Sequence, residues 1–288
     1  MQTANTWKDY ALLDCSGGER LELWGDVVLI RPDPQVIWDT PKDPALWGSA
    51  HAAYTRSHKG GGSWHFLRKI NEPWVIQWQE LRFNLRCMGF KHTGVFPEQA
   101  VNWARLGALI LAANRPVKVL NLFAYTGCAS LACAAAGAHV THVDAAKGMV
   151  QWARENAALS GLAEKPVRWL VDDCGGFVQR ELRRGNRYDV ILMDPPSYGR
   201  GPGGEVWKLE KEIHPLVRDC AALLSDDPLA FLVNSYTTGL SPSVMGYLLH
   251  TEIAATRGGQ IDCDEIGLPV TSTGRTLPCG ASAIWRSN

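Results

Sequence analysis

Three acidic residues in the middle of the sequence follow apolar runs, and each has the chemistry to bind a polar ligand. Asp144 ends the run VTHVD, Asp173 lies in VRWLVDDC, and Asp194 ends YDVILMD. A carboxylate at the end of a buried strand can accept hydrogen bonds from both hydroxyls of a ribose, and Asp144 is suited to this role. The alternative for Asp144 is that it caps the helix that follows.

The second acid is followed directly by a cysteine. The carboxylate of Asp173 could accept a hydrogen bond from an exocyclic amine, while the backbone N–H of Cys174 donates to a ring nitrogen. Together these two groups would recognise the edge of an adenine. The alternative is that Asp173 only caps the helix that begins near Gly175 and Gly176.

Two prolines follow the third acid, in the run Asp194-Pro195-Pro196-Ser197-Tyr198. Neither proline donates an N–H and both restrict φ, so we predict a rigid turn whose carbonyl groups point outward as acceptors. Such a turn suits the binding of a planar amine or base. Tyr198 either stacks on that base or packs within its own loop. The glycine-rich stretch 199–207 is either a mobile flap over the bound group or an irregular connection.

An apolar run that stops at a turn glycine precedes the acids. We interpret KVLNLFAYTG, residues 118–127, as the first strand of a parallel sheet with the loop at its carboxyl end, and CASLACAAAG as the helix that follows. A helix N-terminus offers free N–H groups, and Gly127 allows close backbone approach. This unit alone serves any nucleotide-like ligand. With Asp144 it is also compatible with an NAD-dependent oxidoreductase, although G-x-G-x-x-G is missing.

The elements that must position these residues alternate between strand and helix from residue 93 onward. Such alternation predicts βαβ units in an α/β fold, with a mostly parallel sheet covered by helices on both faces. The last two strands are predicted to pair antiparallel at one edge. After the first strand, which lies within 118–127, the predicted strands are 139–144, 167–171, 188–193, 229–234, 260–266 and 277–286. The predicted helices are 97–114, 145–159, 176–184, 208–224 and 241–256.

Residues 1–92 differ from the remainder, residues 93–288, which we predict to be the catalytic domain. The first part has short alternating strands separated by glycine and proline turns, so we predict a small β-rich N-terminal domain with one short helix near 45–54. Seven of the 12 tryptophans lie before residue 80. They either stack on bases or fill the core of this small domain.

Composition limits the class of protein. The chain has 288 residues, with 29 basic and 29 acidic side chains, so a global basic surface of the kind many nucleic-acid-binding proteins carry is absent. Its eight cysteines are scattered without C-x-x-C, which indicates reduced thiols and a cytoplasmic location. We find no secretory signal and no apolar run long enough to span a membrane. His51, His58, His65 and His92 share no metal-ligand spacing, so we expect no metal.

Taken in order, the motifs resemble those of class I S-adenosylmethionine-dependent methyltransferases, and more closely the group that methylates bases of bacterial large-subunit ribosomal RNA. The resemblance covers roughly residues 90–240 and implies a Rossmann-like fold. The motifs that carry it are HTGVFPEQ (92–99), LNLFAYTG (120–127), WARENAALSGL (152–162), VDDC (171–174) and ILMDPPSYG (191–199).

This resemblance implies S-adenosylmethionine as cofactor and assigns roles to individual residues. The segment 93–99, with Phe96 and Gln99, would close over the cofactor, and Asn121 stands where many relatives have an acid. The methionine end would be lined by Phe123, Ala124, Tyr125, Thr126 and Gly127. The ribose would be bound by Asp144 beside Ala145, and the adenine by Asp173 and Cys174. Asp194, Pro195, Pro196 and Tyr198 would face the methyl acceptor.

One departure bears on the reaction. Relatives that methylate carbon 5 of cytosine have a nucleophilic cysteine on the strand after the DPP motif, and here Tyr236 occupies that position. We therefore expect transfer to a nitrogen of a base in RNA rather than to carbon 5, and the resemblance implies that this RNA is ribosomal. A small-molecule or protein acceptor, and a cofactor-binding module without catalysis, stay open as alternatives. The arginines 180, 183, 184 and 187 either touch phosphate or form a solvated helix face.

Overall fold

The computed structural model describes residues 1–57, 61–201, 203–237 and 239–288, and the chain forms two compact units. The sheet unit comprises Met1–Gln2, Val101–Ile266 and Gly280–Asn288, and the N-terminal unit comprises Thr3–Ala100 and Gly267–Cys279. The first boundary between the units falls after Ala100, whereas we predicted a domain boundary at residue 92. The segment Gly267–Cys279 also belongs to the N-terminal unit, because it contains the end of β16 (Gln260–Pro269) and the start of β17 (Thr276–Arg286). The functional domain boundary stays a prediction.

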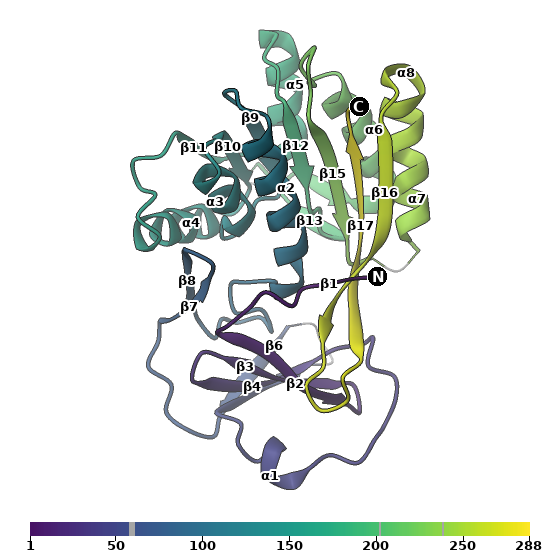
Figure 1. Ribbon diagram of the computed structural model, residues 1–288. Coiled ribbons are helices and arrows are strands. Elements are labelled where there is room, and N and C mark those ends of the chain that lie inside the picture. The colour runs from purple at the N-terminus through teal and green to yellow at the C-terminus, as the bar shows by residue number, and fades with distance from the viewer. Residues whose placement is uncertain (58–60, 202, 238) are drawn as a thin grey trace. The chain divides into compact units, whose positions relative to one another are not determined.

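The sheet unit is built on an eight-stranded sheet of order β1-β16-β17-β15-β12-β9-β10-β11. The four strands β12, β9, β10 and β11 are parallel neighbours and β15 is parallel to β12, whereas β17 is antiparallel to β15 (Figure 1). The predicted mostly parallel sheet with an antiparallel edge is confirmed. The strands are β1 (Gln2–Thr3), β9 (Lys118–Leu122), β10 (His139–Asp144), β11 (Val167–Val171), β12 (Val190–Met193), β15 (Ala230–Ser235), β16 (Gln260–Pro269) and β17 (Thr276–Arg286).

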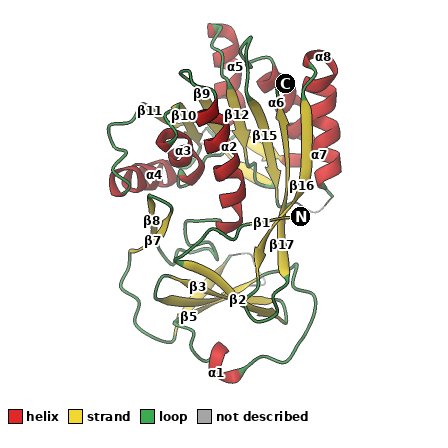
Figure 2. Ribbon diagram, viewed as in Figure 1, coloured by secondary structure: helices red, strands yellow, loops and turns green. Residues whose placement is uncertain are grey.

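Helices cover both faces of this sheet (Figure 2), because alternate residues of its buried strands are apolar on both sides. Along β9, Val119 packs with the core that includes Ile110 of α2, while Leu120 packs with the core that includes Phe177 of α5. The helices are α2 (Ala100–Ala112), α3 (Cys128–Ala135), α4 (Lys147–Leu159), α5 (Cys174–Arg184), α6 (Leu209–Ala221), α7 (Pro242–Leu249), the π-helical turn η2 (His250–Ala254) and α8 (Ala255–Arg257).

The N-terminal unit contains a five-stranded sheet of order β2-β3-β4-β5-β6 and a separate hairpin, β7–β8. Its elements are β2 (Tyr10–Ser16), β3 (Glu19–Trp24), β4 (Val27–Pro32), α1 (Pro44–Trp47), β5 (Ala52–Arg56), β6 (Gly62–Phe66), β7 (Trp74–Trp78), β8 (Leu81–Leu85) and the short helix η1 (Pro97–Gln99). The predicted β-rich character is confirmed. The single helix predicted near 45–54 is wrong in its second half, since that part is strand β5.

The reason for this difference lies at the two ends of α1. The Asp43 side chain caps its start by accepting a hydrogen bond from Ala45 N, and the N–H of Gly48 closes its only turn. A Cβ at Gly48 would lie 2.7 Å from Pro44 O. The backbone N–H of His51 then donates to Val28 O, which commits the following residues to the sheet. Local helical periodicity cannot reveal such a tertiary strand pairing.

A buried group of charges holds the N-terminal unit together. Glu22 is fully buried, and its carboxylate accepts hydrogen bonds from Arg31 at 2.6 and 2.7 Å and from the Tyr10 hydroxyl at 2.8 Å. The Arg20 guanidinium lies 3.7 Å from the same carboxylate. Burial by itself raises the pKa of Glu22, but Arg31 and Arg20 outweigh it and lower that pKa from 4.5 to about 2. The carboxylate is therefore ionised in the folded protein at all ordinary pH values.

We predict that Glu22→Gln lowers the free energy of unfolding by about 3 kcal/mol at neutral pH, because it leaves Arg31 buried without its partner. The folded-state pKa lies below the unfolded value, so the stability contributed by Glu22 is complete above about pH 4.5 and disappears as the pH falls through about 2. The difference between wild type and variant in urea unfolding, followed by tryptophan fluorescence, should shrink over that range. Glu19→Gln, which breaks an exposed pair with Lys42, is the control and should change stability by under about 1 kcal/mol.

Candidate functional site

The residues singled out from the sequence converge at the carboxyl ends of four neighbouring strands. Parallel registers align Leu122 of β9 with Val143 of β10 and Met193 of β12, and align Asp144 with Val171 of β11. The next residues along each strand therefore meet at one edge of the sheet. Within the sheet unit this edge brings together the loop after β9, Asp144, the Asp173-Cys174 pair and Asp194.

The loop after β9 has an unusual backbone. Phe123, Tyr125 and Gly127 all have positive φ, at 54°, 50° and 84°. Side chains other than glycine rarely adopt this region, so the first two must be held by their surroundings. Tyr125 N donates to the Asp144 carboxylate at 2.8 Å, and Ala124 N donates to Val143 O at 3.1 Å. These bonds tie the loop to the end of β10.

Asp144 organises this edge. One carboxylate oxygen accepts from Tyr125 N and the other from Ala146 N, both at 2.8 Å. Burial raises the pKa of Asp144, and the two backbone donors act against that rise. The capping alternative is thus realised, but a carboxylate has about four acceptor positions, so lone pairs are left for ribose hydroxyls. Ribose binding by Asp144 beside Ala145 stays a prediction.

Asp173 and Cys174 begin α5. Asp173 is the N-cap, and its side chain accepts from Gly176 N at 2.7 Å. Cys174 is buried, and its sulfur accepts from Phe123 N at 3.3 Å. Burial raises the pKa of this thiol well above its usual value, so it is neutral and serves to join α5 to the loop after β9. Adenine recognition by Asp173 and the Cys174 N–H stays a prediction.

A chain of buried polar side chains lies beneath the loop. The Asn121 amide donates to the Ser130 hydroxyl at 2.9 Å, and this hydroxyl lies 3.0 Å from Nδ1 of His142. Burial lowers the pKa of His142 to about 3, so its ring is neutral. The Asn156 amide supports the loop from below by donating to Thr126 O at 2.9 Å. Asn121 is buried and engaged in this chain, and its predicted contact with the cofactor is untested.

The acceptor side centres on Asp194. Its carboxylate accepts from the amide of Asn234 at 2.9 Å, and Asn234 is only 1% exposed at the end of β15. Sequence reasoning missed Asn234, because only the parallel pairing of β15 with β12 brings residues 194 and 234 together. Pro195 and Pro196 follow Asp194, and neither has a backbone N–H to donate within the turn.

The glycine-rich stretch 199–207 has regular structure at both of its ends, and its role as a mobile flap stays a prediction. Antiparallel strands β13 (Tyr198–Arg200) and β14 (Val206–Lys208) form a hairpin, while Pro202 lies outside the described residues. The Trp207 indole donates to Pro196 O at 2.6 Å, and its ring lies 4.9 Å from that of Phe123. The Pro196 carbonyl was expected to point outward as an acceptor; it accepts from Trp207, and with two lone pairs its availability to a ligand stays a prediction. Tyr198 is 53% exposed, so its ring is accessible to a stacking partner.

The position of the missing cysteine is filled by a packed ring. A Cβ added to Gly280 of β17 would lie 2.9 Å from the Tyr236 ring, so this glycine makes room for the tyrosine. The neighbouring hydroxyls of Thr237 and Ser197 lie 2.6 Å apart and join β15 to the DPP turn. Thr238 lies outside the described residues.

Two predicted cofactor contacts belong to the other unit. Phe96 and Gln99 lie in the N-terminal unit, where Gln99 N donates to Phe96 O at 3.1 Å around η1. Their approach to the cofactor stays a prediction.

The residues of the sheet unit suit an adenosine-containing donor without a metal. A close backbone approach at Gly127, acceptor lone pairs on Asp144 and a rigid turn after β12 all meet at one edge. Among the described residues no group of three or more histidines, cysteines or carboxylates could hold a metal ion. In the described part of the chain we also find no helix with the length and apolar character needed to cross a bilayer.

We predict that Gly127→Ala disrupts this edge. The new Cβ would lie 2.8 Å from the Ala153 side chain, and φ of 84° is unfavourable for alanine, so the free energy of unfolding should fall by about 2 kcal/mol or more. Affinity for S-adenosylhomocysteine, measured by calorimetry, should fall at least about tenfold. Gly161→Ala is the matched control, since it has φ of 68° and open space; equal losses in both variants would contradict the prediction.

Comparison with known proteins agrees with this geometry. Residues 53–233 match a family described as S-adenosylmethionine-dependent methyltransferases. The chain is 32% identical over 169 residues to ribosomal RNA large subunit methyltransferase K/L of Shewanella frigidimarina, which covers 58% of this chain and 23% of that protein. It is 35% identical over 118 residues to the protein of the same name from Shewanella baltica, covering 41% and 16%. It thus spans about a quarter or less of these curated relatives.

A solved structure is similar over nearly the whole chain. The SAM-dependent methyltransferase from Agrobacterium tumefaciens is 38% identical, with a TM-score of 0.93, over 98% of this chain and 91% of that one. The family match extends over more than half of the sequence and agrees with this similarity. The chain belongs to the family of S-adenosylmethionine-dependent methyltransferases.

Proposed function

We propose that this protein transfers a methyl group from S-adenosylmethionine to a nitrogen of a base in ribosomal RNA. The family supports the donor. The name shared by the Shewanella relatives, ribosomal RNA large subunit methyltransferase K/L, supports RNA as the acceptor. Membership in the methyltransferase family favours this donor over NAD, which the first strand–loop–helix unit would also suit.

The choice of nitrogen over carbon 5 rests on the chemistry of the thiols. Methylation of carbon 5 of a pyrimidine needs a thiolate that adds to the ring, and Tyr236 occupies the position where relatives have that cysteine. The thiols at 128, 133, 174 and 220 are buried, and burial raises the pKa of each of them. The remaining cysteine of the sheet unit, Cys263, lies on β16 and packs against Gly246 of α7. Cys263 is exposed, but β17 separates its strand from β15, so it does not stand where the nucleophile would be needed.

The hydrogen bond between Asn234 and Asp194 is the observation that carries the proposal. By donating to one carboxylate oxygen, Asn234 orients the Asp194 side chain. An oriented carboxylate can accept an N–H of a base and so aim the nitrogen lone pair. The exposed ring of Tyr198 is available to stack on that base. S-adenosylmethionine, when bound, supplies an electrophilic methyl group on a sulfonium, and the protein then contributes mainly position and exclusion of water.

The ribose assignment leads to a first prediction. Asp144→Ala should weaken binding of S-adenosylhomocysteine at least about tenfold. It removes the carboxylate that would accept hydrogen bonds from the ribose hydroxyls, and it leaves the N–H of Tyr125 without that acceptor. Isothermal titration calorimetry measures the change, with Asp172→Ala at the neighbouring strand end as the control. Normal affinity in Asp144→Ala would contradict the assignment.

The acceptor assignment leads to a second prediction. Asp194→Asn should lower the rate of methyl transfer to ribosomal RNA by about 10² or more, while affinity for S-adenosylhomocysteine changes by less than about threefold. The substrate is RNA from cells that lack the gene, and mass spectrometry of its nucleosides identifies the product.

An N-methylated base that forms with wild type and not with Asp194→Asn is the expected result. A 5-methyl pyrimidine as product would overturn the nitrogen assignment. Transfer to a small molecule or protein with none to RNA would overturn the acceptor class.

A further inference from the structure

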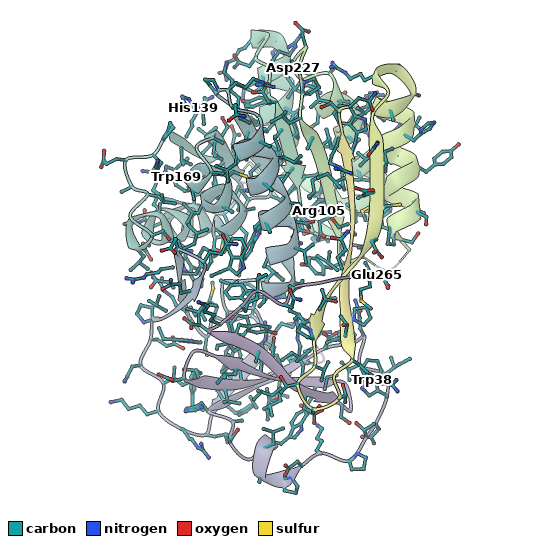
Figure 3. All side chains as sticks on the ribbon, viewed as in Figure 1. Trp38, Arg105, His139, Trp169, Asp227 and Glu265 are labelled. Atoms are coloured by element: carbon teal, nitrogen blue, oxygen red, sulfur yellow. The ribbon has the colours of Figure 1, made fainter. Side chains whose placement is uncertain are left out.

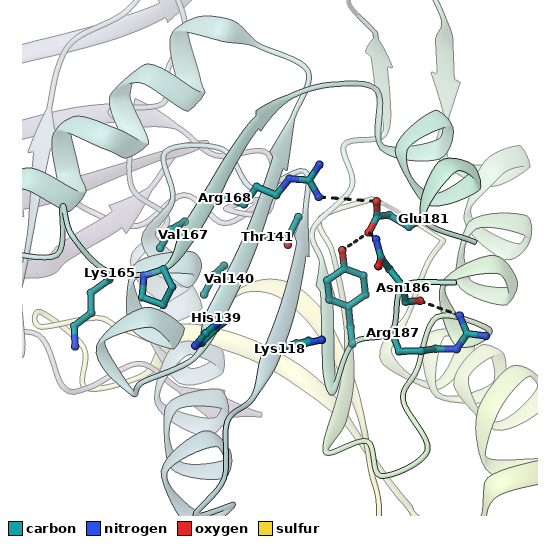
Figure 4. A pocket seen from close by; sticks show the side chains of 12 residues that line it. Lys118, His139, Val140, Thr141, Lys165, Val167, Arg168, Glu181, Asn186 and Arg187 are labelled. Carbon is teal, nitrogen blue, oxygen red and sulfur yellow. Dashed lines mark hydrogen bonds and ion pairs between the residues drawn. The ribbon is translucent and has the colours of Figure 1, made fainter. Parts of the chain in front are cut away.

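The sheet unit has a second pocket at the opposite edge of its sheet. A cavity of about 480 Å³ is lined by residues that begin β9, β10 and β11 and by the segment between α5 and β12 (Figure 4). This volume lies in the range of small-ligand pockets. The residues of β10 from His139 to Asp144 span about 17 Å, so the pocket is separate from the edge that carries Asp144. Figure 3 shows His139 and Asp227 near this same end of the sheet.

Strand periodicity explains why polar side chains meet here. Lys118 and His139 are register partners on β9 and β10, and Thr141 and Arg168 are register partners on β10 and β11. They alternate with core residues such as Val119 and so share one face of the sheet. The α5 helix ends at Arg184, before this edge, which leaves that face open at the strand starts.

The charges of the pocket are unbalanced toward the positive. Lys118, Lys165, Arg168 and Arg187 line it together with His139, against a single carboxylate, Glu181. Among the described residues, neither Lys118 nor Lys165 forms an ion pair, and both side chains are exposed. Two cations of the pocket thus lack a carboxylate partner within the described chain.

The one carboxylate is already neutralised by its neighbours. Glu181 is fully buried and accepts from the Tyr188 hydroxyl at 2.7 Å, the Asn186 amide at 2.7 Å and Arg184 at 2.9 Å, with Arg168 at 4.0 Å. Burial raises the pKa of Glu181, but these hydrogen bonds outweigh it and lower the pKa, so the group stays ionised. A second anion can therefore enter without facing an uncompensated charge. Figure 4 shows Glu181 between Arg168 and Asn186.

From this arrangement we infer that the pocket binds a phosphate ester. The amines of Lys118 and Lys165 supply point charges, and the guanidinium groups of Arg168 and Arg187 supply paired donors of the kind that bind phosphate oxygens. Pro166, Val167 and Tyr188 add apolar surface beside them. The cavity exceeds what one phosphate needs and has room for a nucleotide.

Two sources share this chemistry, a free mononucleotide and one phosphodiester of an RNA strand. The site does not depend on the identity of the methyl acceptor. It gives a role to Arg187, whereas Arg180 pairs with Asp172 and Arg184 pairs with Glu181 within the protein.

The test uses the full chain with Lys118→Glu and Lys165→Glu, and with Lys211→Glu as the control. Lys211 is an exposed lysine of α6 that does not line the pocket, so the control matches the change in net charge. The Lys118 side chain is also exposed, and Lys118 binds Asp189 through its backbone N–H and C=O alone, so the fold should survive. Affinity for S-adenosylhomocysteine should be unchanged in all three variants, which shows that the substitutions leave the carboxyl-end edge of the sheet intact. A loss of phosphate binding then reports on the pocket and not on the methyl-acceptor site.

Two probes separate the sources: adenosine monophosphate, measured by calorimetry in phosphate-free buffer, and a short single-stranded RNA without a terminal phosphate, measured by fluorescence anisotropy at low salt. If the pocket takes a free nucleotide, affinity for adenosine monophosphate falls about tenfold or more in both pocket variants and not in the control. If it takes a phosphodiester, RNA affinity falls by a similar factor with a shallower salt dependence. Equal behaviour of the pocket variants and the control with both probes overturns the inference.

Discussion

The carboxylate of Asp144 is the constraint on which the candidate site depends. It accepts hydrogen bonds from the N–H groups of Tyr125 and Ala146, so one side chain fixes both the loop after β9 and the start of α4. The positive φ angles of Phe123 and Tyr125 are costly for side chains of their size, and the bond to Tyr125 N helps to offset that cost. The carboxylate that would bind the ribose therefore also holds the loop that would line the methionine end of the cofactor.

The two edges of the sheet have opposite character. Asp144, Asp173 and Asp194 follow the carboxyl ends of their strands, whereas Lys118, Lys165 and Arg168 lie at or just before the amino ends. The formal net charge of zero does not reveal this separation, because it counts the charged residues without regard to their positions. Composition alone excluded only a global basic surface, and the fold gathers four basic side chains and His139 in one pocket at the amino ends of the strands.

The order of strands and helices could be predicted in the sheet unit because its signals are local. Apolar runs, turn glycines and acids at strand ends stand beside the residues that they organise, and the strand predictions at 139–144 and 167–171 match β10 and β11. The failures have a common physical cause. The bonds of Asn234 to Asp194 and of Trp207 to Pro196 join residues 40 and 11 positions apart, and strand β5 forms only because β4 and β6 lie beside it. No periodicity within one segment reports such pairings.

Trp207 makes a contact that a local sequence rule could not predict. Two prolines do remove backbone donors from the turn after Asp194, and this was read as leaving its carbonyl groups free for a ligand. The β13–β14 hairpin returns the chain over that turn, and the indole of Trp207 takes the Pro196 carbonyl while its ring packs on Phe123. One side chain thus links the acceptor turn, the hairpin and the loop that would face the methionine end of the donor. Because these three segments share Trp207, displacement of the hairpin would disturb the loop after β9 and the turn after Asp194 together.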